Sequence, residues 1–116
     1  MTKRHPQKID GSLWEVTAGS ALAGEDSVTG AMRELREETG IAVGAEQMKL
    51  LYSRTGHDFF LDSYIVHLDE DGEDISVVLQ AGETVDFIWA DWETQAQMEK
   101  DGQLVLIARE ARTYLK

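Results

Sequence analysis

The spacing of apolar residues between positions 27 and 39 predicts one amphipathic helix. At about 100° per residue, the apolar side chains fall on a single stripe that would face the core. This stripe consists of Val28, Ala31, Met32 and Leu35. Asp26 or Ser27 can cap the beginning of the helix, and Gly40 follows where a left-handed residue commonly ends one.

Runs of β-branched and aromatic residues predict the strands. These runs lie at residues 13–17, 48–54, 59–68 and 84–90, with a less marked run at 75–79. Because residues 59–68 are apolar on both faces, we expect a central strand covered by helices on both sides. Two more helices are predicted, at residues 94–100, where Thr94 and Gln97 have capping-box spacing, and at 103–115. The fold class is therefore α/β, in the broad sense that includes α+β.

Length and composition restrict the class of protein. A chain of 116 residues is the size of one domain. Its 11 basic and 22 acidic residues give a net charge of −11, which repels nucleic acids and anionic membranes, so we expect neither as a partner. The sequence has no cysteine, no visible secretory signal and no apolar run near the roughly 20 residues of a membrane span. We therefore expect a cytoplasmic protein.

Three acidic residues share one face of the predicted helix. Glu34, Glu37 and Glu38 lie at positions i, i+3 and i+4, within an arc of about 100°. Glu34 and Glu38 repel each other, and anions are unfavourable in the last turn of a helix. Arg33 offsets only part of this cost. A solvated charged face is one interpretation, but clustered carboxylates are also the ligands that Mg²⁺ or Mn²⁺ prefers.

These acids belong to a longer motif. From Gly19 the sequence reads GSALAGEDSVTGAMRELREETGI, which fits the pattern G-x5-E-x7-R-E-U-x-E-E-x-G-U, where U is aliphatic. The chain thus resembles the Nudix hydrolases. Every fixed position is filled, by Gly19, Glu25, Arg33, Glu34, Leu35, Glu37, Glu38, Gly40 and Ile41.

The resemblance implies a fold, an activity and a ligand set. The fold would be an α/β/α sandwich with a mixed sheet, formed as a single domain by residues 1–116. The activity would be metal-dependent hydrolysis of a nucleoside diphosphate linked to another moiety, so the partner would be a small nucleotide-type molecule. Glu34, Glu37 and Glu38 would bind Mg²⁺ or Mn²⁺ together with the carbonyl oxygen of Gly19.

The resemblance also implies roles for other residues. Arg33 would orient a glutamate of the cluster, although an ordinary surface ion pair is the alternative. The general base would be Glu38, Glu34 or an acid from a later loop, for which Glu83 is the best placed. Three candidates for substrate contact are Arg4, Trp14 and His57; their structural alternatives are a solvated basic end, a core aromatic and an exposed turn histidine.

The sequence departs from the family pattern in two places. Thr17-Ala18-Gly19 stands where many members have Pro-Gly-Gly, and Ala18 lacks the freedom of glycine at positive φ. Only 18 residues precede the motif, where members usually have two strands or more. We therefore expect a domain that lacks its usual first strands, with open sheet edges that favour a homodimer.

The shortened start also allows a second function, a module that binds a nucleotide or nucleotide sugar but turns it over poorly or not at all. Two other interpretations are weaker. Isopentenyl-diphosphate isomerase chemistry would need a catalytic cysteine, which the chain lacks. A purely structural acidic domain would leave the three glutamates on one helix face unexplained.

Overall fold

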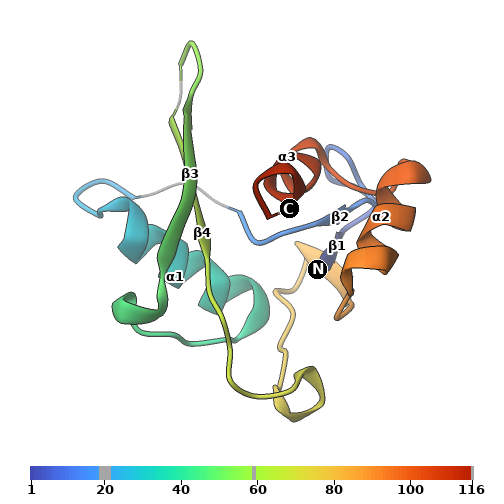
Figure 1. Ribbon diagram of the computed structural model, residues 1–116, viewed down its shortest axis with the longest axis horizontal. Helices are drawn as coiled ribbons and strands as arrows, with labels where there is room; N and C mark the ends of the chain where they lie inside the picture. Colours follow the sequence, from blue (N-terminus) through green and yellow to red (C-terminus); the bar gives the residue numbers. More distant parts are fainter. Residues whose placement is uncertain (19–21, 59, 116) are drawn as a thin grey trace.

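The computed structural model describes residues 1–18, 22–58 and 60–115 (Figure 1). Strands and helices are mixed along the chain, which confirms the predicted fold class. In order, the elements are β1 (Thr2–Arg4), β2 (Trp14–Glu15), α1 (Ser27–Thr39), η1 (Ala45–Gln47), β3 (Lys49–Thr55), β4 (Phe60–Ile65), η2 (Gly72–Asp74), β5 (Thr84–Phe87), α2 (Trp92–Lys100) and α3 (Leu106–Leu115).

The strands form two small antiparallel sheets. One has the order β2-β1-β5, in which Thr2 pairs with both Glu15 and Phe87. The other is the hairpin of β3 and β4. In the part of the chain that the structure describes, parallel pairing is limited to a bridge between Trp14 and Leu104, so the sheet is mixed only at that point. Figure 1 shows the β3–β4 hairpin and α1 on one side and β1, β2, α2 and α3 on the other.

Helix α1 has the predicted bounds, and its two ends explain why. The Asp26 side chain caps the first turn by accepting a hydrogen bond from the Thr29 backbone amide at 2.9 Å. Gly40 has a φ of 78° and donates its amide hydrogen to the Arg36 carbonyl at 2.8 Å. The amide of Val78 then donates to the carbonyl of Thr39 at 2.8 Å, which fixes the last turn against a distant segment.

One predicted strand is absent, and another lacks the predicted central position. Residues 75–79 form no strand, and the Val78 amide is instead bonded to the end of α1. The run at 59–68, whose first residue lies outside the described residues, forms the strand β4 but not a central one. Among the described residues β4 pairs only with β3, and Phe60 is 86% exposed. Apolar residues on both faces indicated burial, but the sheet that would bury them has only two strands here.

The two C-terminal helices begin at residues other than those predicted. Helix α2 starts at Trp92 because the Asp91 side chain, rather than Thr94, is the cap; it accepts the Thr94 amide at 2.7 Å. Residues 103–105, predicted as helix, run beside β2 instead. There the Trp14 amide donates to the Gln103 carbonyl at 2.8 Å, and the Val105 amide donates to the Trp14 carbonyl at 3.0 Å.

The core is small and lies beside β2. Met98 of α2, Leu104 and Ala108 of α3 form a buried cluster, and Trp14 packs against it. Helix α3 also contacts the hairpin, because the rings of Tyr52 and Tyr114 stack with centroids 4.1 Å apart. A cavity of about 890 Å³ lies between α1, β4, β2, the end of β5 and α3. This hollow separates the two sides of the molecule and is where the candidate site opens.

Candidate functional site

Arg33 of α1 contacts three acidic side chains. Its guanidinium lies 3.0 Å from a carboxylate oxygen of each of Glu25, Glu34 and Glu37. These ion pairs raise the pKa of Arg33, the hydrogen bond to Glu25 being the largest cause. The structure therefore brings Arg33, Glu34 and Glu37 together, and the contact of Arg33 with Glu37 is the one that their i, i+4 spacing predicts.

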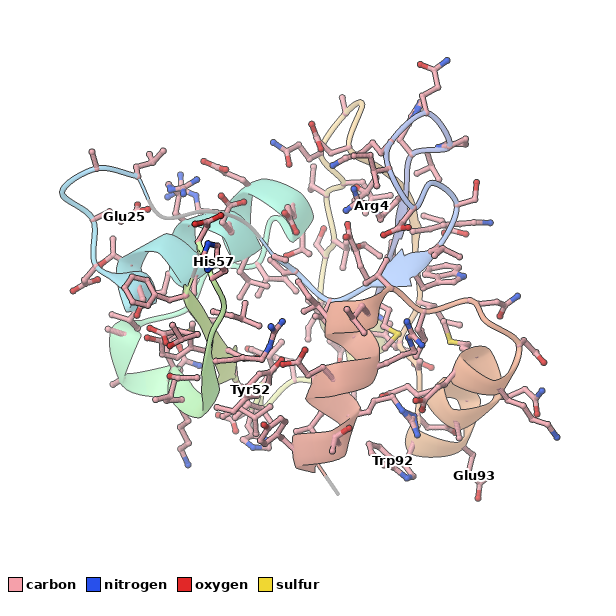
Figure 2. The ribbon with its side chains drawn as sticks, turned by 90° about the horizontal axis from the view of Figure 1, so that it is seen from above. Arg4, Glu25, Tyr52, His57, Trp92 and Glu93 are labelled. Carbon is pink, nitrogen blue, oxygen red and sulfur yellow. The ribbon has the colours of Figure 1, made fainter. Side chains whose placement is uncertain are left out.

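Glu25 connects the preceding loop to the helix. One of its oxygens also accepts the backbone amide of Leu22 at 2.8 Å, which closes the loop 22–25 on itself. The hydrogen bond from Arg33, followed by that from Leu22, lowers the pKa of Glu25. The Glu25 carboxylate is thus ionised and paired with Arg33. It lies near the start of α1, as Figure 2 shows.

Glu38 has a different environment from the other acids of the helix. It is only 9% exposed, and its buried Oε2 has no hydrogen-bond partner. Burial raises its pKa to about 8, helped by the charges of Glu15 and Glu34, while the Ala18 backbone amide opposes the shift. A buried, unpaired carboxylate oxygen is costly, so this group needs a proton or a cation.

Glu15 on β2 is a member of this group that the sequence analysis did not select. It is 7% exposed, and its Oε2 accepts a hydrogen bond from Arg4 Nη1 at 2.7 Å. Its position two residues before the loop and next to Trp14 was visible in the sequence. A strand of two residues does not reveal which of its side chains points inward, so only the fold could identify it.

The cavity borders two of these acids. Glu15 and Glu34 both line it, and most other lining side chains are apolar, among them Leu35, Leu61 and Ile107. Among the described residues that form its wall there is no lysine, arginine or histidine. An anionic group that entered the cavity would therefore meet carboxylates without a basic side chain, and would need a cation between them.

Glu83 lies in the loop before β5 and is held by Lys8. The two side chains form an ion pair, and this hydrogen bond is the largest cause that lowers the pKa of Glu83. The charge of Lys8 also lowers the pKa of Glu38. Lys8 thus lowers the pKa of both acids, but only with Glu83 does it form an ion pair among the described residues.

The three candidates for substrate contact lie apart from the cavity wall. Arg4 is occupied by Glu15 and by the Ile9 carbonyl, to which its Nε donates at 2.9 Å. Trp14 packs against the core cluster. The His57 side chain is 97% exposed in the turn between β3 and β4, a hairpin whose tip extends away from the rest of the molecule (Figure 1). Substrate contact by these residues stays a prediction.

Comparison with known proteins decides the family. The family model described as NUDIX domain matches residues 1–110. The chain belongs to the Nudix family. A comparison with curated protein sequences finds no match.

Among solved structures, the Nudix chain is similar to the crystal structure of a MutT/nudix family protein from Enterococcus faecalis. The TM-score is 0.59 at 19% identity, and the similarity covers 71% of this chain and 32% of that one. At this identity the likeness supports the fold alone. The chain thus spans about a third of the solved structure that it matches.

The Nudix acids suit a hard divalent ion by donor type but are not arranged as a finished site. In residues 1–18, 22–58 and 60–115, no group of three acidic or histidine side chains is positioned to hold a metal ion. Glu34 and Glu37 face Arg33, and Gly19 lies outside the described residues. The unpartnered Oε2 of Glu38 is the atom that best fits a cation, because it is buried and has no other donor.

No helix in the described part of the chain is long and apolar enough to cross a membrane.

Proposed function

We propose that this Nudix chain is a metal-dependent hydrolase that cleaves a nucleoside diphosphate linked to another moiety, by attack of water on the diphosphate. The supporting observation is the buried carboxylate of Glu38, whose Oε2 has no hydrogen-bond donor and which is close enough to Glu15 and Glu34 for their charges to raise its pKa. A structural helix gains nothing from such a group. In a cation-binding enzyme such a group is useful, because the cation supplies the missing partner of the carboxylate oxygen.

The proposed ligands are Glu34, Glu37, Glu38 and the carbonyl oxygen of Gly19. Mg²⁺ or Mn²⁺ bound there would neutralise the diphosphate and lower the pKa of a coordinated water. The wall of the cavity has no basic side chain among its described residues, and the chain carries a net charge of −11. Both facts make a cation necessary for an anionic substrate.

The chain's own residues would then orient the carboxylates and accept protons. Arg33 contacts Glu34 and Glu37 and fixes the direction of both carboxylates. We assign the general base to Glu38, because its pKa is raised toward the working range of a base near neutral pH. Glu34 and Glu83 are the alternatives, and Lys8 keeps Glu83 ionised.

The test is a substrate panel with Mg²⁺ or Mn²⁺. It contains nucleoside triphosphates, ADP-ribose, dinucleoside polyphosphates and nucleotide sugars, and it compares the wild type with Glu38→Gln. We expect turnover of at least one compound by the wild type and a loss of at least about 100-fold in Glu38→Gln, which keeps the shape but not the charge. Equal background rates for both proteins would contradict the hydrolase.

One observation favours a second function, binding of a nucleotide or nucleotide sugar without turnover. Arg33 holds Glu37 in an ion pair on the exposed side of α1, away from the buried oxygen of Glu38, so the acids are not gathered as ligands in the described residues. Titration calorimetry with the same panel separates the two functions. Heat of binding without product formation would favour the binding module.

A further inference from the structure

Three aromatic side chains that line the cavity stay exposed and have no role in the function proposed above. Phe60 is 86% exposed, Phe87 39% and Trp89 49%, and all three line the cavity. Phe60 begins β4, whereas Phe87 ends β5 and Trp89 follows it by two residues. Exposed aromatic side chains gathered around a cavity indicate a place where a ligand with an apolar surface is held.

The ring of Trp89 is set apart from the two phenylalanines by a close contact with the backbone. A Cβ built on Gly72 would lie 2.8 Å from Cγ, 2.9 Å from Cδ1 and 2.9 Å from Cδ2 of the indole. A point that is nearly this far from all three of these neighbouring ring atoms lies above the ring plane, not at its edge. Gly72 therefore packs against one face of the indole, and a residue with a side chain does not fit there.

The opposite face of the indole is left for another partner. Trp89 remains half exposed although Gly72 covers one face, so its accessible surface belongs to the other face and to the ring edges. Because Trp89 lines the cavity, this surface is within reach of a molecule bound there. An aromatic ring that is backed by main chain on one side and open on the other is placed for stacking with a planar group.

The charges around the cavity indicate which part of a nucleotide belongs beside Trp89. Its described wall contains the carboxylates of Glu34 and Asp62 but no lysine, arginine or histidine, so a diphosphate cannot bind there without a cation. A nucleobase carries no charge and has two apolar faces. The volume of about 890 Å³ is in the range of sites for small molecules, and stacking on an aromatic ring accepts every base.

We propose that Trp89 is the residue on which the base of the nucleotide stacks, and that Gly72 is a positioning residue that holds the indole toward the cavity. The proposal rests on the nucleotide-type substrate given above and extends it to residues outside the motif. Glu34 lines the cavity from α1 and Trp89 from the segment after β5, so different elements hold the diphosphate and the base. A purine binds more tightly than a pyrimidine, because its larger ring system covers more of the indole.

The direct test uses adenosine and uridine in EDTA, because nucleosides have no phosphate and need no cation. Adenosine should quench the tryptophan fluorescence of the wild type saturably, and at lower concentration than uridine. The same quenching is expected in Trp92→Phe but not in Trp89→Phe, which lacks the ring that reports stacking. Quenching by adenosine that persists in Trp89→Phe would overturn the proposal.

Trp92 provides the matched control for this experiment. It is 41% exposed, close to the value for Trp89, but it is not among the described residues that line the cavity. It begins α2, packs over the guanidinium of Arg112 at 4.2 Å, and lies at the other end of the molecule from Glu25 (Figure 2). Its replacement therefore changes the tryptophan content equally without touching the proposed base site.

A second readout separates stacking from support of the fold. The dissociation constant of adenosine, measured by nuclear magnetic resonance titration, should rise about fivefold or more in Trp89→Leu and by less than about threefold in Trp89→Phe, which keeps an aromatic ring. In Trp92→Phe it should stay within about twofold of the wild-type value. If Trp89→Leu melts at a lower temperature but binds adenosine as tightly as the wild type, the ring is structural and the proposal is overturned.

Gly72→Ala tests the position of the ring while Trp89 is still present, and it replaces Trp89→Leu if that variant does not fold. Gly72 is not among the described glycines at positive φ, so alanine adds no backbone strain and acts through its contact with the indole. Weaker binding of adenosine by Gly72→Ala supports the proposal, and unchanged binding overturns the role of Gly72.

The proposed hydrolase fails separately from the base site. Binding of adenosine that depends on Trp89, in a protein that hydrolyses no compound of the panel, would leave the base site standing and contradict only the hydrolase. Turnover of a nucleotide with the same KM in Trp89→Leu as in the wild type would contradict only the base site. A wild type that binds neither nucleoside would overturn the proposal for Trp89 whatever its activity.

Discussion

At the scale of single residues, one arginine determines which acid of the helix bears the electrostatic cost. The spacing of Glu34, Glu37 and Glu38 predicts repulsion among all three. Arg33 contacts the first two, together with Glu25, and leaves Glu38 beside Glu34 and Glu15 in a buried position. The cost is therefore concentrated at Glu38, which is where a bound cation would recover most free energy.

This concentration predicts a pH dependence in the metal-free protein. The pKa of Glu38 is about 8 when folded and near 4.5 in an unfolded chain, so the folded state holds the proton more tightly. The wild type should lose stability as the pH rises from about 5 to 8, and Glu38→Gln should not lose this part. In EDTA, urea denaturation measures the unfolding free energy of both proteins. Over that pH range, the value for Glu38→Gln should rise by about 1–3 kcal/mol relative to the value for the wild type. Parallel stability curves for the two proteins would show that Glu38 is not buried as a charge.

At the scale of elements, the sequence predicted what depends on neighbours along the chain and missed what depends on pairing. Helix α1 has the predicted bounds because Asp26 and Gly40 act within one turn of it. The run at 75–79 has the composition of a strand but finds no partner strand among the described residues. The motif acids were found by spacing alone. Glu15 was not, because its contact with Arg4 depends on the register of β1 with β2.

The C-terminal end of α1 gives a prediction at this scale. Gly40 has a φ of 78°, and a Cβ added there would lie 3.2 Å from the Cβ of Val78. Gly24 has a similar φ of 82° but no neighbour within 4 Å, which makes Gly24→Ala a matched control. We expect each alanine to cost about 1–2 kcal/mol from backbone strain, and Gly40→Ala to cost more because Val78 must move. Urea denaturation of both variants measures the difference in unfolding free energy. Equal losses would show that Val78 moves aside at no measurable cost.

At the scale of the whole molecule, the cavity makes the two sides depend on a few contacts. No large side chain in the described part of the chain is fully buried, and the core cluster of Met98, Leu104 and Ala108 lies on the α2 and α3 side. The hairpin is joined to α3 by the stacked rings of Tyr52 and Tyr114 and by the ion pair of Arg54 with Glu110 at 2.7 Å. The shape of the cavity, and with it the distance between β2 and α1, depends on these contacts.

A double-mutant cycle tests whether the stacked rings of Tyr52 and Tyr114 stabilise the attachment of α3 to the hairpin. Tyr52→Leu and Tyr114→Leu each remove one ring, and we expect a coupling free energy of about 0.5–1.5 kcal/mol between them, since the rings are only 7° from parallel. The control pairs Tyr114→Leu with Leu22→Ala in the loop before α1, where the coupling should stay below about 0.5 kcal/mol. If the tyrosines show no more coupling than the control, α3 is attached to the hairpin through Arg54 and Glu110 instead, and charge rather than ring stacking maintains the cavity beside the acids.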